Sequence, residues 1–562
     1  MAVDFQHYHS YFLFPISIDK QSVAQDHPEI FCKHSTWMNG VEEWVAHPPH
    51  AAGEKVVTVL GGWKRAAYTR FDIDSPAYQD MVFFHPFVRR VFFDSAERFT
   101  AVPGNESLLQ CYAMDPSSAG KLWLEGEDAK GRRTSLEITD LRLFVFANGI
   151  AVLSIGVEAT NISSTQALWA NEAMRKVYPS SRRQLREGRV PHRLALVWEP
   201  PEGPRQPLAE EAFEGVGMKG FQPPLARTIQ GLLHFANYDT QEYEPMLDER
   251  MIVYTYAVLD PASLPEDYAG SEAYQVLLSR LLYVDRAGDS YRYAPSFVRE
   301  EMQRQVYRRW AHQGTYYGFT SYSNVTCSIG LFDCDEHELR EGFLIHRMFT
   351  TRYYLMALVT LFYRATLLDF AERTALVSRR LYIDQHEHRF SSANMRLTAE
   401  LRADFLHFSN YWYFDELANK DEESQHFLMQ VREYRIDSMK REVEEEIDKL
   451  DGSLHNYHQF LNTAAVNRLA MLSLILGAGA VVTGFFGMNF QGIFSKTLFE
   501  PTTHPLPLHL AAIVFVTLFA VGALSFGAYL VMSNWPDYRE SLLPRWWLAR
   551  KTRDQGSLRR GR

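Results

Sequence analysis

Two long uncharged runs near the carboxy terminus dominate the hydrophobic pattern of the chain. Leu469–Phe486 contains 18 residues and Leu510–Met532 contains 23, and neither run holds a charged side chain. At a rise of about 1.5 Å per residue, each run can cross a hydrocarbon layer about 30 Å thick. The pattern therefore predicts a carboxy-terminal hairpin of two membrane-spanning helices.

Shorter hydrophobic runs in the first three hundred residues have the character of β-strands. Leu141–Glu158 alternates on both sides of Asn148-Gly149, a pair that favours a two-residue type I′ turn, so this segment predicts a β-hairpin. The proline-rich stretch at 199–208 cannot continue a helix or a central strand, and we interpret it as a linker between two lobes or an exposed excursion. Further strands are expected at Lys55–Leu60, Arg98–Val102, Leu108–Ala113, Arg193–Trp198, Met251–Leu259 and Tyr316–Ile329.

The pattern becomes helical from Asp335, where Glu338 completes a capping-box signature. Tyr353–Leu368 is strongly apolar, but it is short and contains Arg364. We therefore predict a buried core helix there rather than a third membrane span. A second helical stretch is expected at Ser391–Leu417.

A long stalk helix is predicted next, because Glu422–Asn489 contains no proline over 68 residues. If continuous it would be about 100 Å long, with Gly452 as its weakest point. An apolar seam on this helix, with alternating steps of three and four, predicts side-by-side packing with helices of the same or another subunit. The seam consists of Ile447, Leu450, Leu454, Tyr457, Leu461 and Ala464.

Composition and charge narrow the class of protein. Hydrophobic residues make up 46% of the 562 residues, and the mean hydropathy of -0.25 fits a mostly water-exposed protein with a small membrane portion. A net charge of -10, with no basic surface upstream of the carboxy-terminal tail, argues against nucleic-acid binding as the main activity. The four cysteines lack the spacing of a zinc site or a disulfide framework, so a reducing compartment is expected.

Positive charges near the spans predict the orientation of the chain. The tail at 534–562 carries eight Lys and Arg residues, whereas the loop at 490–507 carries one, Lys496. Both termini should therefore face the cytoplasm, and the amino terminus lacks the basic and apolar regions of a signal peptide. We expect a two-span protein of the bacterial inner membrane whose basic tail contacts anionic lipid headgroups.

A short motif ends the first predicted span. The stretch Phe486–Phe490, with Gly487, Met488 and Asn489 at its centre, lies just before a short loop and the second span. In this position it resembles the CorA family of magnesium transporters, in which a Gly-Met-Asn signature ends the first span. The resemblance implies a homo-oligomer, a pentamer in that family, whose first span lines a pore for Mg²⁺ or a related dication. It also implies that Gly487, Met488 and Asn489 form the selectivity filter on the outer side.

The side chain of Asn489 suits the chemistry of such a filter. Magnesium gives up its water shell reluctantly, so a ring of neutral carbonyl oxygens can hydrogen-bond the hydrated ion without trapping it. Along the first span, a stripe of small residues shares one helical face and is either a pore wall or a site of close helix packing. The stripe comprises Ser473, Gly477, Ala480 and Gly484, and Thr483 adds a hydroxyl that could instead bond its own backbone.

A run of six acidic residues and one lysine lies just before the first span, at 442–451. It is either a solvated face of the stalk or a regulatory site at which carboxylates of neighbouring subunits share cytosolic Mg²⁺ and hold the channel closed. Candidate ligands are Glu444, Glu445, Asp448 and Asp451.

Other candidate chemistry is weaker. His7 and His9, like His386 and His388, are spaced so that a strand would place both on one face, but without a nearby Cys or carboxylate set we expect surface residues rather than a zinc site. The sequence shows no phosphate-binding loop, nucleophile elbow or catalytic carboxylate pair, so we expect neither an enzyme nor an organic cofactor.

These features predict a CorA-like oligomeric channel with an α+β cytoplasmic domain, a long helical stalk and a two-helix transmembrane hairpin. An alternative is a ligand-gated membrane effector on the same scaffold, in which the enlarged amino-terminal domain binds a nucleotide or another signal; a tethered enzyme or binding module is a third. The predicted parts are a cytoplasmic α/β domain at 1–334, a helical and stalk region at 335–464, a transmembrane helix at 465–489, an extracytoplasmic loop at 490–507, a second transmembrane helix at 508–533 and a basic tail at 534–562.

Overall fold

The computed structural model divides the chain into two compact units, Met1–Asp448 and Lys449–Arg562. The structure describes residues 3–34, 36–66, 82–92, 108–116, 120–178, 190–213, 223–247, 250–265, 268, 271–288, 293–330, 344–386 and 392–487, together with a few residues between 514 and 529.

The described strands of the first unit form one 13-stranded sheet with the order β11-β12-β13-β10-β1-β6-β5-β4-β7-β8, while β2, β3 and β9 pair off this path. Neighbouring strands are antiparallel except for the parallel pair β10–β13. The strands are β1 (Asp4–Ile18), β2 (Lys64–Arg65), β3 (Leu109–Met114), β4 (Lys121–Glu127), β5 (Arg133–Phe146), β6 (Ile150–Ser163), β7 (Arg193–Glu199), β8 (Gln206–Ala212), β9 (Tyr243–Pro245), β10 (Ile252–Leu259), β11 (Val306–Tyr307), β12 (Thr315–Phe319) and β13 (Ser323–Ile329).

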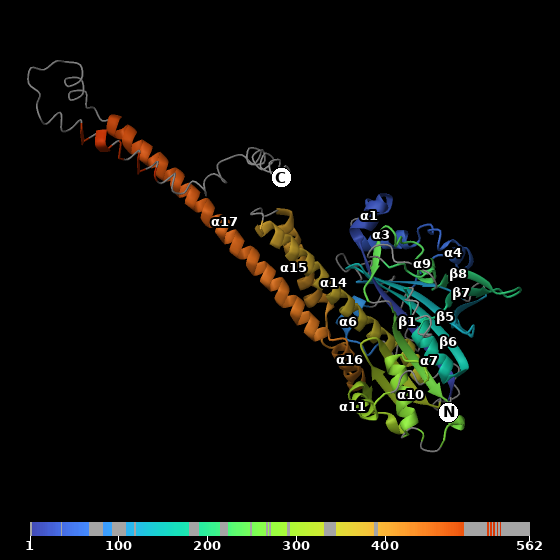
Figure 1. Cartoon of the computed structure of the whole chain (residues 1–562). Coiled ribbons are helices and arrows are strands. Elements are labelled where there is room, and N and C mark those ends of the chain that lie inside the picture. Colours follow the sequence, from blue (N-terminus) through green and yellow to red (C-terminus); the bar gives the residue numbers. More distant parts are fainter. Residues whose placement is uncertain are drawn as a thin grey trace, which may run out of the picture. The chain divides into compact units, whose positions relative to one another are not determined.

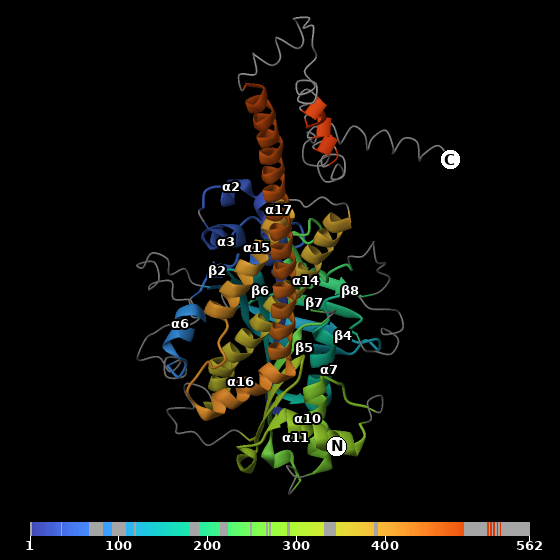
Figure 2. The ribbon, with the colours of Figure 1, turned by 90° about the vertical axis from the view of Figure 1, so that its left-hand side faces the viewer.

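Helices cover both faces of this sheet, and α14 and α15 lie on the opposite side from α7 (Figures 1 and 2). Short 3₁₀ turns occur at Pro261–Ser263 and Ala311–Gln313, and a π-helical turn occurs at Phe408–Trp412. The helices are α1 (Lys20–Asp26), α2 (Pro28–Phe31), α3 (Trp37–Val45), α4 (Glu54–Leu60), α6 (Pro86–Phe92), α7 (Ser164–Met174), α9 (Arg227–Leu232), α10 (Glu272–Tyr283), α11 (Pro295–Gln305), α13 (Leu344–Thr350), α14 (Arg352–His386), α15 (Ser392–His407), α16 (Asp421–Glu433) and α17 (Ile436–Gly487).

Strand β1 is the centre of the sheet. It pairs with β10 along one edge and with β6 along the other, and almost all of its residues are buried. Because successive side chains of a strand point to opposite faces, Tyr8 reaches Asn171 on α7 while Tyr11 packs against Tyr354 on α14. Both faces of β1 are therefore covered by helices.

Helix α14 is the apolar helix predicted at Tyr353–Leu368. Its Tyr354 hydroxyl donates to Ser154 on β6, and the ring of Phe362 stacks on Phe146 with centroids 4.2 Å apart. By length and composition Ile345–Asp384 could also cross a membrane, yet 78% of its most apolar window is buried inside the unit. The prediction of a buried core helix is confirmed.

The hairpin predicted around Asn148-Gly149 is confirmed as β5–β6, but its turn type is not. Only Gly149 of the pair has a positive φ, at 100°, and its N–H donates to the carbonyl of Phe146 at 2.9 Å. This geometry is a type I turn followed by a left-handed glycine rather than a two-residue type I′ turn. The side chain of Asn148 stabilises it by accepting a bond from the N–H of Ile150.

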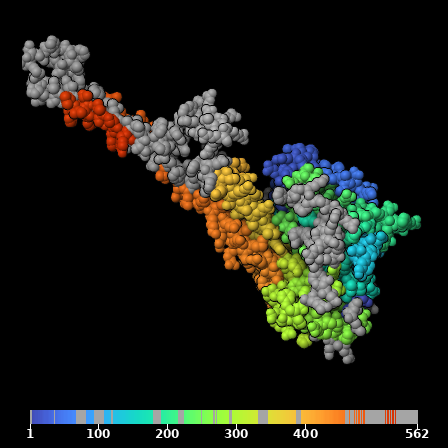
Figure 3. All heavy atoms as spheres, in the orientation of Figure 1, coloured from blue at the N-terminus to red at the C-terminus, as the bar shows by residue number. Residues whose placement is uncertain are grey.

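One other expectation is wrong, and a second is decided between its two alternatives. The strand predicted at Lys55–Leu60 is helix α4, whose Val56 and Leu60, one turn apart, are both buried. The proline-rich stretch at 199–208 joins β7 to β8 within the same sheet, so it is an exposed excursion rather than a linker between lobes. Its tip projects from the surface of the unit (Figure 3). The strand predicted at Arg98–Val102 lies outside the described residues.

The long helix predicted from Glu422 is broken. Helix α16 ends at Glu433, Arg435 adopts a left-handed backbone with φ 58°, and α17 starts at Ile436. Helix α17 then runs for 52 residues, which corresponds to about 78 Å.

A buried ion pair joins α14 to α16. The guanidinium of Arg352 contacts the carboxylate of Glu423, with side chains only 7% and 2% exposed. We expect Glu423→Ala to lower the free energy of unfolding of the first unit by about 3–5 kcal/mol, because it removes the carboxylate that compensates a buried cation. Thermal and urea denaturation of the purified protein measure this loss.

The matched control is Glu400→Ala, which breaks an exposed pair with Arg396 on α15. Such a surface pair contributes little, so the control should unfold like the wild type. Equal losses in the two variants would contradict the stabilising role of the buried pair.

Candidate functional site

The second unit presents one polar and small-residue face of α17. The exposed positions recur with alternating steps of four and three, which is the spacing of a seam between parallel helices. No proline interrupts this stretch, so the helix carries the face without a break into the predicted membrane span. The face consists of Gly452, Asn456, Gln459, Thr463, Val466, Ala470, Ser473, Gly477, Ala480 and Gly484.

The predicted pore candidates lie in the upper half of this face. Ser473, Gly477, Ala480 and Gly484 are exposed, and a Cβ placed on either glycine would meet nothing within 4 Å. The hydroxyl of Thr483 donates to the carbonyl oxygens of Gly479 and Ala480, at 2.9 and 3.2 Å. Thr483 therefore bonds its own helix, while the small residues leave room for a neighbouring helix or an open path.

The lower half of the face escaped the sequence reasoning. Asn456, Gln459 and Thr463 continue the same spacing toward the amino terminus of the helix and offer neutral oxygens. The spacing of these polar residues can be read from the sequence, where it runs beside the apolar seam of the same helix. Of that apolar seam, Ile447 and Leu454 are buried and Leu450 is half-buried, whereas the side chains of Tyr457, Leu461 and Ala464 lie outside the described set.

The Gly-Met-Asn motif stands at the end of α17. Gly487 is the last residue of the helix, whereas Met488 and Asn489 lie outside the described residues. The same holds for the loop at 490–507 and the tail at 534–562. The filter therefore stays a prediction.

The acidic run lies on α17 at the level of 442–451. Glu444, Asp448 and Asp451 are spaced so that they share one side of the helix, and Glu445 lies next to them. The first two and Glu445 are exposed, and Asp451 is half-exposed. Within the described part of a single chain, these carboxylates do not form a compact metal-binding group.

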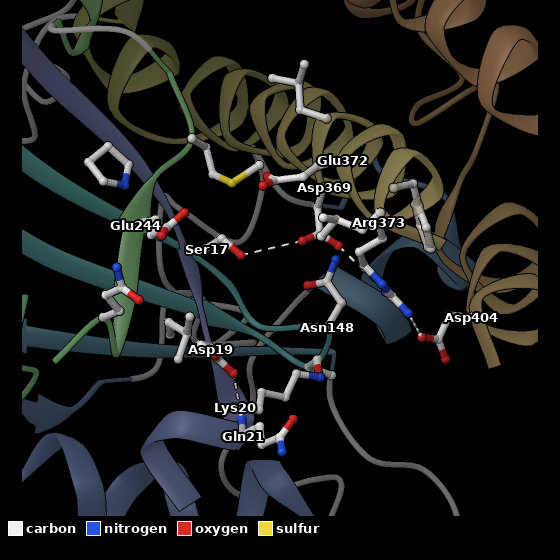
Figure 4. Close-up of a pocket in the computed structure, with 18 of the residues that line it drawn as sticks. Ser17, Asp19, Lys20, Gln21, Asn148, Glu244, Asp369, Glu372, Arg373 and Asp404 are labelled. Carbon is white, nitrogen blue, oxygen red and sulfur yellow. Dashed lines mark hydrogen bonds and ion pairs between the residues drawn. The ribbon is translucent and has the colours of Figure 1, made fainter. Parts of the chain in front are cut away.

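The first unit contains a polar pocket that sequence reasoning missed. It has a volume of about 770 Å³, which is the size of a small-molecule site. Its walls come from the end of β1, the β5–β6 hairpin, β9, α14 and α15, and no sequence pattern brings five such distant segments together. Figure 4 shows Ser17 of β1 facing Asp369 of α14, while Arg373 of α14 points toward Asp404 of α15.

The charged residues that line this pocket favour a cationic ligand. Five acidic side chains and two basic ones line it, so the net charge is negative. Arg373 already pairs with Asp369 and Asp404, and the ammonium of Lys20 donates to the carbonyl of Ala147 at 2.9 Å. Burial lowers the pKa of Lys20 and raises the pKa of Asp369, which Arg373 partly opposes. The acidic side chains are Asp19, Glu244, Asp369, Glu372 and Asp404.

Comparisons with known proteins point to one family. Residues 372–526 match the family model described as CorA-like Mg2+ transporter protein. A search of the curated proteins finds no match. Among solved structures, the complete structure of the CorA magnesium transporter from Methanocaldococcus jannaschii matches with 13% identity and a TM-score of 0.21, covering 51% of this chain and 92% of that chain. At that TM-score the likeness supports no argument about the fold.

The family match spans the second half of α14, α15, α16, all of α17 and most of the second predicted span. A family of transporters agrees with the expectation that the protein is not an enzyme. The resemblance seen in the sequence is thus confirmed for this segment, since residues 372–526 match the model of the CorA-like Mg²⁺ transporter family.

Proposed function

We propose that the protein is a membrane channel for Mg²⁺ or a related divalent cation, gated by its cytoplasmic domain. The family match at residues 372–526 carries this proposal. The predicted domain plan fits it, with a cytoplasmic part at 1–464, spans at 465–489 and 508–533, and both termini in the cytoplasm.

The ion path follows the polar face of α17. A hydrated dication needs acceptors for the hydrogens of its water shell and no fixed anion that would hold it. Asn456 and Gln459 offer such neutral amide oxygens near the inner end of the face, and Asn489 would offer them at the outer end. Between them, Ser473, Gly477 and Ala480 present little bulk.

Several copies of the chain are needed for this path. One helix face cannot enclose an ion, so the polar face of α17 must be repeated around an axis, as in a homopentamer. The exposed small residues permit close approach of the copies. The basic tail at 534–562 contacts anionic headgroups on the cytoplasmic side.

Removal of the predicted filter amide should abolish most of the transport. Asn489→Ala takes one hydrogen-bond acceptor from every subunit, each contributing about 1 kcal/mol, so we expect Mg²⁺ flux to fall about tenfold or more. The measurement is Mg²⁺ uptake into liposomes that contain the purified protein and a fluorescent indicator.

The matched control is Gln491→Ala, which removes a carboxamide two residues beyond the motif and should leave the flux near that of the wild type. If Asn489→Ala conducts Mg²⁺ as fast as the wild type, the prediction that Asn489 forms the selectivity filter is wrong. No flux in the wild type under any condition would remove the channel itself.

The acidic run is proposed as the inhibitory Mg²⁺ site. Changing Glu444 and Glu445 to Gln together with Asp448 to Asn removes ligands that neighbouring subunits would share. We expect inhibition by Mg²⁺ inside the liposomes to need about tenfold more ion, because a dication held by fewer carboxylates binds more weakly.

The matched control changes Glu442 and Glu446 to Gln, one turn apart on the opposite side of α17. This variant loses two negative charges, against three in the triple variant, but none of the proposed ligands. Equal inhibition in the wild type and the triple variant would assign the run to a solvated helix face.

The acidic pocket favours a second candidate function, a channel opened by a small ligand. Its net negative lining disfavours a nucleotide, whose phosphates would be repelled, and suits an organic cation. Spermidine is a suitable probe, with ATP as the anionic counterpart.

We expect spermidine, but not ATP, to raise the melting temperature of the protein by a few degrees, and Asp369→Asn to reduce that shift by about half or more. Asp384→Asn, on the same helix outside the pocket, is the control. Liposomes that conduct Mg²⁺ only with spermidine would favour the ligand-gated function. If spermidine does not change the melting temperature, the proposal that the pocket binds an organic cation is wrong.

A further inference from the structure

Three histidines that lie far apart in the sequence meet inside the first unit. His7 and His9 project from the same face of β1, and His346 comes from α13. One ring nitrogen of each lies within 4.8 Å of the others. The expectation that His7 and His9 are surface residues is therefore wrong, since His9 is only 2% exposed.

A carboxylate joins this cluster. Oε1 of Glu158, on β6, lies 3.2 Å from Nδ1 of His9, and Nε2 of His346 lies 2.8 Å from the same nitrogen. A hydrogen on Nδ1 can satisfy only one of these two acceptors well. Nδ1 of His9, Nε2 of His346 and Oε1 of Glu158 thus lie close together, and each is an atom that can ligate a cation.

The surroundings keep the imidazoles neutral. Burial lowers the pKa of His7 and, more strongly, that of His9, where His346 and His7 contribute further. Burial also lowers the pKa of His346 to about 4, with a smaller contribution from His7.

An outer shell holds the ligands in place. The hydroxyl of Thr139 donates to Oε1 of Glu158 at 3.0 Å, and such a bond orients a carboxylate ligand. The rings of Tyr11 and Phe349 pack against His9, with centroids 4.6 and 5.4 Å away. Tyr256 packs against both His7 and His346.

The distances fit a small metal ion. Bonds of about 2.0–2.1 Å in a tetrahedral site place ligand atoms about 3.3–3.5 Å apart. Nδ1 of His9 lies 2.8 Å from Nε2 of His346 and 3.2 Å from Oε1 of Glu158, slightly less than this value, so these atoms must move apart a little to hold an ion. Imidazole nitrogens suit Zn²⁺, Co²⁺ and Ni²⁺, whereas Mg²⁺ prefers oxygen ligands and keeps much of its water.

We propose that His7, His9 and His346, with Glu158 beside His9, bind a divalent transition metal of the Zn²⁺, Co²⁺ or Ni²⁺ class. The site is independent of the proposed transport function and of its Mg²⁺. The bound ion joins α13 to β1 and β6, and it thereby fixes the segment that leads directly into α14. It stabilises the fold and couples the position of α13 to the supply of that metal.

A second histidine group provides the control. His27, Glu29 and His47 also bring their ligand atoms close together, but Glu29 is exposed and His27 is already 3.1 Å from Glu242. This arrangement is more open and already satisfies one of its rings. A variant in this group therefore loses a histidine without touching the proposed site.

The test uses the full-length protein in detergent, stripped with a chelator and then dialysed against Co²⁺. Elemental analysis should find about one more equivalent of Co²⁺ per chain in the wild type than in His346→Gln or His7→Asn, and the ligand-field absorption of Co²⁺ should decrease in parallel. His47→Gln should match the wild type. Co²⁺ should also raise the melting temperature of the wild type, and millimolar Mg²⁺ should not displace it.

Two separate site variants keep the test decisive if one of them fails to fold, and circular dichroism identifies that case. If either folded variant binds as much Co²⁺ as the wild type and keeps its absorption, the proposal is overturned. It is also overturned if the wild type binds no Co²⁺, or if Mg²⁺ displaces the ion.

Discussion

The first unit depends on the complete enclosure of β1. This strand pairs along both edges, with β10 and β6, and helices cover both of its faces. A polar side chain on such a strand cannot reach water, so it must find a partner inside the protein. The hydroxyl of Ser10 lies 2.7 Å from that of Thr255, and Tyr8 donates to Asn171. The histidine cluster is the part of β1 where neighbouring protein atoms satisfy this demand least completely.

The two candidate ligand sites of the first unit lie at opposite parts of β1. Ten residues separate His7 from Ser17, which corresponds to about 33 Å along the strand. The α13–α14 segment covers both, since His346 precedes α14 and Asp369 lies well inside it. An ion at one site and a ligand at the other would therefore both act on the same helix.

Helix α14 connects these sites to the break before α17. Arg352 pairs with Glu423 on α16, and the hydroxyl of Thr360 donates to Gln430 on the same helix. Two residues separate the end of α16 from the start of α17, and one of them, Arg435, has a left-handed backbone conformation. Such a break is a natural place for a change in helix direction, because one residue can absorb the change in backbone angles. A continuous helix from Glu422 would have offered no such joint.

Local signals in the sequence predicted the local structure well. The hairpin at Asn148-Gly149 and the buried helix at Tyr353–Leu368 follow from the alternation of side chains and from Arg364 within a short apolar run. The strand predicted at Lys55–Leu60 failed because its β-branched residues suit a strand, while burial of Val56 and Leu60 on one side favours a helix.

The candidate sites show the limit of such reasoning. The polar face of α17 lies on one element, so its spacing could be read from the sequence. The histidine cluster could not be read from the sequence, because 337 positions separate His9 from His346 and no sequence pattern predicts their contact. The pocket is harder still to predict from the sequence. Its prediction would require the register of β1, the turn after β5 and the packing of α14 and α15.

The proposed conduction path and the proposed histidine site would offer cations two kinds of environment, and the difference between them has a physical reason. A conduction path must let a dication leave, so neutral amides that bond its water are better than charged ligands. The histidine cluster differs in both respects, because His9 is buried, Glu158 lies 3.2 Å from it, and imidazole nitrogens would bind an ion directly after its water is lost. An ion that gives up water readily can enter such a site, and one that keeps its water cannot. If both proposals hold, the chain would pass one metal while it binds another, because the two ions use different kinds of ligand.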